Sequence, residues 1–173
     1  MPFYKKRLRL SANHYLGRHI YFITITSERR ATIFADLSIG EWLLSHLLQR
    51  ASLQNFSMHA YCVMPDHVHF VCEGLSDTCD LVAFVNAFKQ RTGYEFRAKH
   101  GSRLWQMRYY DHILRPKEKI EDAACYIWWN PVRKGLCREP HQYPLCGSST
   151  IDWIKGSSAN TKWLPPWKSK EPG

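Results

Sequence analysis

The first half of the chain alternates between two hydrophobic periods. Residues 19–27 are rich in β-branched and aromatic side chains, which is typical of a strand. From Ile39 to Leu53 the apolar positions recur at helical spacing. Asp36 stands just before this run and can cap the helix. The pattern therefore predicts a strand followed by a helix.

A hairpin is expected next along the chain. Residues 56–64 alternate apolar and polar side chains, and residues 67–72 form a second apolar run. Pro65 and Asp66 separate the two runs, and both are typical turn residues. Two strands joined by so short a turn are expected to pair with each other.

The second half repeats the alternation of helices and strands. A helix is expected to begin at Asp77 or Asp80, and residues 105–114 are predicted to form a strand. A last helix is predicted over residues 117–129, which Pro131 ends or kinks. The whole order is β-α-β-β-α-β-α. It favours an α+β fold, a ferredoxin-like or split βαβ antiparallel sheet with helices packed mainly on one face.

One domain with two tails accounts for a chain of 173 residues. Residues 1–18 are interpreted as a basic N-terminal arm, residues 19–138 as the domain, and residues 139–173, rich in Pro, Ser and Trp, as an irregular C-terminal tail. Lys155 to Gly173 is expected to be flexible. Neither a signal peptide nor a membrane-spanning segment is recognised, so an intracellular, reduced protein is expected.

The balance of charge points to a partner. The net charge is +9 and the isoelectric point is about 9.4, which favours polyanions, and nucleic acid is the commonest of these. Aromatic residues make up 14% of the chain, and unpaired bases are usually held by stacking on aromatic rings. Charge alone leaves RNA and membranes open as partners. The chain carries no Gly-rich phosphate loop and no HExxH or GxSxG motif.

Two histidines on the second hairpin strand form the first candidate site. Residues i and i+2 of a strand point to the same face, so the imidazoles of His67 and His69 are expected to converge. Two neutral imidazoles side by side supply half of a divalent-metal site. The same pattern fits a half-buried strand with two polar residues facing solvent, and the spacing alone leaves both interpretations open.

Tyr126 and Asn130 form the second candidate site. They lie four residues apart in a predicted helix and so share a face. A tyrosine hydroxyl can attack a phosphodiester and hold DNA covalently, and an amide oxygen can complete a metal shell. The residues alone favour another interpretation, in which Tyr126, Trp128 and Trp129 form an aromatic helix end buried in the core.

Basic and aromatic residues around the predicted 105–114 strand are candidate DNA contacts. A basic run is usually a solvated face, but interleaved aromatic rings fit a groove that follows a nucleic-acid backbone better. The candidate DNA-binding residues are Arg91, Arg97, Lys99, Arg103, Trp105, Gln106, Arg108, His112 and Arg115.

Three segments in this order resemble a known family. Residues 61–70 (YCVMPDHVHF) look like the histidine strand of the HUH transposases. Residues 104–115 (LWQMRYYDHILR) and 126–136 (YIWWNPVRKGL) are similar to the REP-associated tyrosine transposases, bacterial relatives of the small single-tyrosine insertion-sequence transposases. The resemblance implies a metal-dependent enzyme that nicks single-stranded DNA near hairpins of palindromic repeats and transfers the cut strand.

The resemblance also implies roles for single residues. His67 and His69 match the family's ligands for Mg²⁺ or Mn²⁺, and Tyr126 matches its nucleophile. In the insertion-sequence relatives a glutamine four residues after the tyrosine completes the metal shell, and here that residue is Asn130, a shorter amide. The implied product is a 5′-phosphotyrosine link with a free 3′-hydroxyl.

A non-catalytic nucleic-acid-binding module is the alternative function. The βαββαβ order with surface aromatic residues also describes RNA-recognition domains. Their aromatic pattern is missing from residues 68–72, and a binding module has no need for paired histidines. A basic structural protein is a third class. By resemblance, we expect a cytoplasmic protein at the bacterial nucleoid that is a monomer, with a homodimer left open because some relatives are dimers.

Overall fold

The computed structural model describes residues 11–158 and 161–168, so the basic stretch 1–10 lies outside the described residues. The main elements are β1 (Ile20–Thr26), α1 (Leu37–Leu53), β2 (Phe56–Met64), β3 (His67–Gly74), α2 (Leu81–His100), β4 (Tyr110–Ile113), α3 (Ile120–Trp128), α4 (Asn130–Arg133), β5 (Cys146–Gly147) and α5 (Trp153–Gly156). Short 3-10 helices are η1 (Ala12–Tyr15), η2 (Glu28–Arg30), η3 (Ile33–Ala35) and η4 (Pro140–Gln142). The predicted order of strands and helices is confirmed, and with it the α+β class.

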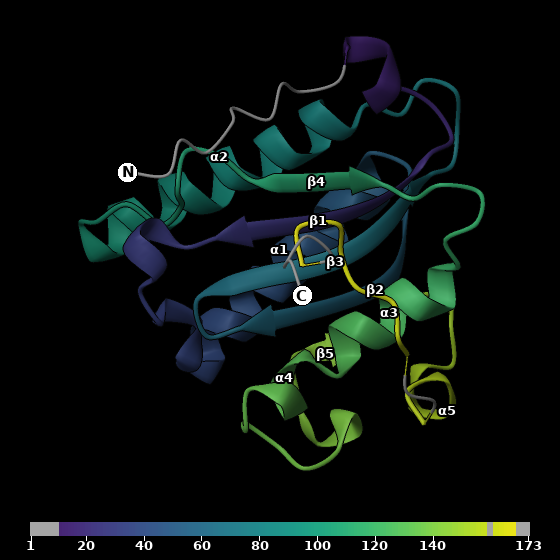
Figure 1. The fold of residues 1–173 in the computed structure, drawn as a ribbon. Helices are drawn as coiled ribbons and strands as arrows, with labels where there is room; N and C mark the ends of the chain where they lie inside the picture. The colour runs from purple at the N-terminus through teal and green to yellow at the C-terminus, as the bar shows by residue number, and fades with distance from the viewer. Residues whose placement is uncertain (1–10, 159–160, 169–173) are drawn as a thin grey trace, which may run out of the picture.

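All the strands form one antiparallel sheet in the order β4-β1-β3-β2-β5 (Figure 1). β2 and β3 pair as the predicted hairpin, with Met64 opposite His67 and only Pro65 and Asp66 between them. β1 lies between β4 and β3. The centre of the sheet is therefore made by β1 and β3, and β3 carries both histidines of the candidate site.

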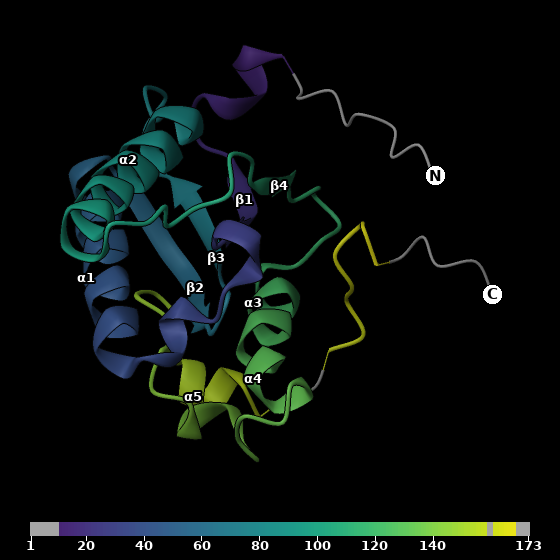
Figure 2. The same cartoon turned by 90° about the vertical axis from the view of Figure 1, so that its left-hand side faces the viewer.

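The helices cover the two faces of the sheet unequally (Figure 2). The long helices α1 and α2 pack side by side on one face, over buried side chains such as Ile23 and Phe70. The shorter α3 lies on the opposite face against β2 and β3, where Tyr126 and Trp128 pack with Phe22. The helices are thus mainly on one face, as predicted. Within the described residues, no helix is both long and apolar enough to cross a bilayer.

The helix ends follow the chemistry of single residues. Asp36 caps α1, and Asp80 rather than Asp77 caps α2; each carboxylate accepts a hydrogen bond from a backbone N–H of the first turn. α2 ends at Gly101, whose φ of 72° is a left-handed conformation that favours glycine. α3 is shorter than predicted, because its N-terminus begins at residue 120 rather than 117.

The strand predicted over residues 105–114 is present only as β4. Residues 103–107 instead run as a loop beside α2, where Lys89 donates hydrogen bonds to the backbone carbonyls of Gln106 and Met107 at 2.9 and 3.0 Å. Trp105 leaves the loop and enters the core between Phe34 and Phe88. Because the chain is anchored there, regular pairing with β1 begins only at residue 110.

The described part of residues 139–173, which we expected to form an irregular tail, packs against the domain. β5 extends the sheet by pairing with β2. α5 is held by a hydrogen bond from Nε1 of Trp129 to the carbonyl of Ser157 at 3.0 Å. Beyond it, Nε1 of Trp163 donates to Glu118 at 3.2 Å. This stretch therefore belongs to the architecture around the site.

Candidate active site

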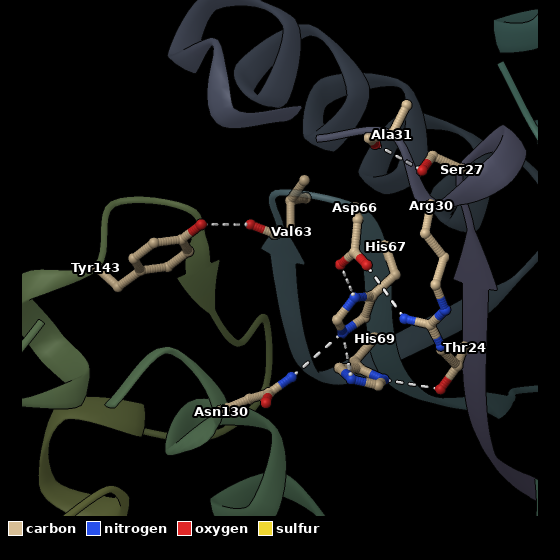
Figure 3. Close-up of polar contacts among 10 residues, drawn as sticks. All are labelled: Thr24, Ser27, Arg30, Ala31, Val63, Asp66, His67, His69, Asn130 and Tyr143. Atoms are coloured by element: carbon tan, nitrogen blue, oxygen red, sulfur yellow. Dashed lines mark hydrogen bonds and ion pairs between the residues drawn. The ribbon is translucent and has the colours of Figure 1, made fainter. Parts of the chain in front are cut away.

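The predicted histidine pair lies on β3, with both side chains on the α3 face of the sheet (Figure 3). Nε2 of His67 and Nε2 of His69 face each other at 2.7 Å, and the two rings are nearly perpendicular. Only 8% of His67 and 5% of His69 is exposed. Strand alternation brings the imidazoles together as predicted. Because both are buried, they are not two polar residues facing solvent, which was the alternative interpretation.

Each imidazole is held in place through its other ring nitrogen (Figure 3). Nδ1 of His67 lies 2.5 Å from a carboxylate oxygen of Asp66, whose other oxygen accepts from Arg30 at 3.1 Å. Nδ1 of His69 lies 2.7 Å from the hydroxyl of Thr24, the residue opposite it on β1. Such partners fix the orientation and tautomer of metal-binding histidines. The sequence analysis did not predict these partners, which are Asp66, Arg30 and Thr24. An acidic residue directly before His67 was the one signal that could have indicated them.

Burial sets the protonation state of this cluster. It lowers the pKa of His67, and the hydrogen bond and attraction to Asp66 offset this only in part. The pKa of His69 lies well below its usual value because of burial and then repulsion from His67. Burial raises the pKa of Asp66, but the hydrogen bond and attraction to His67 and Arg30 outweigh it, so the pKa of Asp66 is lowered. The cluster is two neutral imidazoles with an ionised carboxylate, and neutral imidazole is the form that binds metals.

Asn130 enters the same cluster from the start of α4. Its amide nitrogen lies 3.3 Å from Nε2 of His67 (Figure 3), and the residue is buried. The oxygen and nitrogen of a side-chain amide exchange places when the group turns over, so the oxygen can face the same point. The structure thus brings His67, His69 and Asn130 together. Among the described residues, no group of three His, Cys, Asp or Glu side chains is arranged to hold a metal.

Tyr126 lies on α3 with its ring buried against the sheet. The ring packs on Phe22 at 6.0 Å between centroids, and Phe22 in turn contacts the ring of His69 at 5.8 Å. The guanidinium of Arg133 lies over the Tyr126 ring, 4.3 Å from its centroid. Tyr109, which precedes β4 among the candidate DNA-binding residues and is the alternative nucleophile, packs against the core on the α1–α2 face. Only Tyr126 of these two belongs to the histidine face.

The C-terminal segment 161–168 covers this face of the sheet. Trp163 contacts the rings of Phe22 at 5.4 Å and Tyr126 at 5.6 Å. Trp167 contacts Phe22 at 5.5 Å, and Nζ of Lys168 lies 5.7 Å from the centroid of Tyr126. The segment therefore occupies space directly beside the candidate nucleophile, an arrangement that no local sequence pattern indicated.

Some of the predicted DNA-binding residues line a groove of about 520 Å³ between α2 and the 103–107 loop. Trp105 forms part of its wall, but the side chain is buried and donates to Thr92, so its ring is not available to stack on bases. Exposed apolar surface comes instead from Tyr94 and Met107, which are 73% and 86% exposed. The groove is lined by Asn86, Lys89, Gln90, Gly93, Tyr94, Arg97, Arg103, Leu104, Trp105, Gln106 and Met107.

The other predicted basic contacts on this side lie outside the groove lining. Arg91 is on α2 and forms an ion pair with Glu95 one turn later. Lys99, in the last turn of α2, and Arg108, in the loop before β4, are exposed. Of the predicted arginine contacts on this side, Arg97 and Arg103 are the ones that line the groove.

His112 and Arg115 gather around a different residue, Glu118. Nε2 of His112 lies 2.9 Å from a carboxylate oxygen of Glu118, and the backbone N–H of Arg115 donates to the same carboxylate at 2.7 Å. Trp163 donates to this carboxylate as well. These residues therefore lie at the edge of the face that carries Tyr126, and His112 is buried there rather than exposed to a DNA groove.

Comparison with known proteins identifies the family. The model of the family described as "Transposase IS200 like" matches residues 15–128, which is more than half of the chain and includes both histidines and Tyr126. This protein belongs to the IS200-like transposase family. It is accordingly an enzyme, a transposase.

Individual relatives agree with the motifs. A Haemophilus influenzae protein named as a REP-associated tyrosine transposase is 25% identical over 137 residues, which is 72% of this chain and 77% of that protein. The REP-associated tyrosine transposase of Escherichia coli K12 is 22% identical over 149 residues, 81% of this chain and 87% of that protein. The predicted resemblance to REP-associated tyrosine transposases is confirmed.

Solved structures share the fold. A REP-associated tyrosine transposase bound to a REP hairpin superposes with a TM-score of 0.65 at 20% identity, over 76% of this chain and 78% of that chain. A transposase structure from Deinococcus radiodurans gives a TM-score of 0.50 at 16% identity, over 85% of this chain and 95% of that chain. The antiparallel sheet with its helices is therefore the fold of this transposase group.

Proposed function

We propose that this transposase cuts and rejoins single-stranded DNA beside hairpins of palindromic repeats, through a 5′-phosphotyrosine intermediate on Tyr126. The observation that carries the proposal is the meeting of His67, His69 and Asn130 at one point, one helical turn from a buried tyrosine. A relative with the same fold has been solved with a REP hairpin, which supports hairpin DNA as the partner.

Mg²⁺ or Mn²⁺ is the proposed cofactor, and the residues present fit such an ion. Nitrogen ligands lie about 2.1 Å from a divalent metal. Two Nε2 atoms 2.7 Å apart are close enough to share one ion, and the amide of Asn130 adjoins them. When bound, the ion would polarise the scissile phosphate and stabilise the negative charge that builds on its oxygens.

The bond changes follow from the proposed nucleophile. The hydroxyl oxygen of Tyr126 attacks the scissile phosphorus as it loses its proton. The bond from phosphorus to the 3′ oxygen breaks, that oxygen takes up a proton, and the 5′ phosphate stays on Tyr126. Another 3′-hydroxyl can reverse the step and rejoin DNA without external energy, because the phosphodiester is conserved. Packing on Phe22 holds the ring in place for the attack.

The groove beside α2 is the proposed path of the DNA. Arg97 and Arg103 can neutralise phosphates, and exposed Tyr94 offers a ring on which an unpaired base can stack. The loop that closes the groove donates a backbone hydrogen bond to Thr26 at the end of β1. Thr26 lies opposite His67, so this loop adjoins the end of the strand that carries the histidine pair.

A non-catalytic nucleic-acid-binding module explains the structure less well. Removing two imidazoles from water costs free energy, and a binding surface gains nothing from two imidazoles that are only 8% and 5% exposed. We further propose that the transposase acts as a monomer on nucleoid DNA in the cytoplasm. Light scattering of the protein bound to hairpin DNA tests the monomer, and a mass of two chains would favour the homodimer.

Covalent adduct formation with hairpin-containing single-stranded DNA, in Mg²⁺ or Mn²⁺, tests the proposed function. Tyr126→Phe removes only a hydroxyl, so adduct should disappear while hairpin binding is retained. Tyr109→Phe, on the other face of the sheet, is the matched control and should form adduct normally. His67→Ala should lose cleavage and keep the fold. DNA attached to the peptide of Tyr109 or Tyr110, or full cleavage by His67→Ala in the same metal, would refute the assignment.

A further inference from the structure

Arg133 is a cation placed against the candidate nucleophile without an acidic partner. Its guanidinium carbon lies 4.3 Å from the centroid of the Tyr126 ring, and one terminal nitrogen donates to the Tyr126 carbonyl at 2.5 Å. Arg18, Arg30 and Arg91 each pair with a carboxylate, whereas within residues 11–158 and 161–168 no ion pair engages Arg133. A guanidinium has five N–H donors in a rigid fork. Arg133 contacts only the ring and the carbonyl of Tyr126 in these two interactions, so several of its N–H donors remain available to a ligand.

Helical spacing puts Arg133 there. α3 ends at residue 128 and α4 begins at Asn130, followed by Pro131, but helical backbone hydrogen bonds continue across Trp129, from its N–H to the carbonyl of Cys125 and from the N–H of Arg133 to its carbonyl. Asn130 and Arg133 lie four and seven residues after Tyr126, so all three share one face of this helical run. The face carries the tyrosine, the amide that lies near His67 and the guanidinium to one place.

The charge of Arg133 also reaches the histidine pair. After burial and repulsion from His67, the charge of Arg133 contributes to the lowered pKa of His69, and it opposes the burial that raises the pKa of Cys62, the residue opposite His69 on β2. Arg133 is exposed to solvent. An accessible guanidinium that rests on the ring of the candidate nucleophile is therefore within reach of a bound anion.

We propose that Arg133 is a catalytic residue that binds the phosphate attacked by Tyr126. The anion expected at this position is a phosphodiester, because the group attacked by the Tyr126 hydroxyl must bring its phosphorus within bonding reach. The fork of a guanidinium matches two phosphate oxygens at once, which a lysine cannot do. Resting on the ring of the nucleophile, it orients the phosphate toward the attacking oxygen and stabilises the charge that develops. The proposal rests on Tyr126 being the nucleophile.

A purely structural role is the competing explanation. Arginine side chains cap carbonyls near helix ends, and a cation over an aromatic ring stabilises the packing. Contacts of this kind predict that loss of Arg133 disturbs Tyr126 by the same factor whatever the charge of the substrate. A phosphate contact predicts that the effect of the substitution depends on that charge.

Single-turnover adduct formation on two substrates separates these roles. One is hairpin-containing single-stranded DNA, and the other is the same DNA with an uncharged methylphosphonate at the scissile position. Arg133→Gln should slow the reaction about 10- to 100-fold on the phosphodiester, the size of one lost charge-assisted hydrogen bond. On the methylphosphonate the same variant should lose little. Arg133→Lys should recover part of the rate, and Arg138→Gln, which removes a charge from an exposed residue, is the matched control.

The same comparison can be made by binding. In the non-cleaving Tyr126→Phe background, adding Arg133→Gln should weaken binding of the phosphodiester substrate more than binding of the methylphosphonate. Equal losses on both substrates, in rate and in affinity, would overturn the phosphate contact and leave a structural role. Adduct formation that survives Tyr126→Phe would instead show that the proposed nucleophile is wrong, so the two failures are distinguishable.

Discussion

Asp66→Asn tests whether the histidine pair binds metal, because it changes a charge behind one ligand without removing the ligand. Asp66 is 23% exposed, and its carboxylate oxygen lies 2.5 Å from Nδ1 of His67. An asparagine oxygen can accept the same hydrogen bond, so the tautomer that leaves Nε2 free is kept. A hydrogen bond to a charged group contributes about 1.5–3 kcal/mol and a neutral one about 0.5–1.5 kcal/mol. The difference of about 1–1.5 kcal/mol corresponds to roughly tenfold in metal affinity.

The assay is adduct formation at increasing Mn²⁺ or Mg²⁺ with saturating hairpin DNA. Asp66→Asn should raise the half-saturating metal concentration about tenfold, within the range seen for partners of metal-binding histidines. The maximal rate at high metal should be largely retained. Asp77→Asn makes the same chemical change at a 91% exposed residue paired with Arg18, and it should change neither value. An unchanged half-saturating concentration in Asp66→Asn would refute the support of His67 by this carboxylate.

The remaining predictions concern pH, DNA binding and the C-terminal segment. Because burial lowers the pKa of His67 and His69 in the folded protein, the unfolded chain binds protons that the folded chain does not. The metal-free protein should therefore lose stability as the pH falls below about 6.5, the ordinary pKa of histidine, and equal melting temperatures above and below that pH would contradict this. Affinity for single strands should fall steeply with salt, with a slope of log K against log[salt] of about −0.7 per phosphate neutralised. Arg97→Gln should lower the number of neutralised phosphates by about one, and an unaltered slope would show that Arg97 does not contact the DNA. Trp163→Ala should loosen segment 161–168 from the Tyr126 face and raise the rate of adduct formation several-fold, whereas Trp153→Ala in α5 should not; an equal rise in both variants would show a general loosening instead.

Local patterns predicted most of the elements because the forces behind them are local. The alternation over 56–64 and the Pro65-Asp66 turn are sufficient to specify the β2–β3 hairpin, since a short turn brings the two strands side by side. Strand alternation likewise specifies that His67 and His69 share a face. The loop beside α2 was predicted to be strand because Trp105 fits both a strand and the core, and only packing between Phe34 and Phe88 decides between them.

Local sequence patterns were enough to predict the order of strands and helices, the convergence of the two histidines, and the family that the three motifs resemble. Each depends on residues close together in the chain, where the backbone geometry is set by φ and ψ alone. Three contacts became visible only in the folded chain: Thr24 stands behind His69, Arg133 lies on the ring of Tyr126, and Trp163 contacts that ring. The first and third join segments far apart in the sequence, which meet only after the sheet has formed, so no periodicity records them. The second requires the helical hydrogen bonds to continue past Trp129, where the Asn130-Pro131 pair predicted an end or a kink.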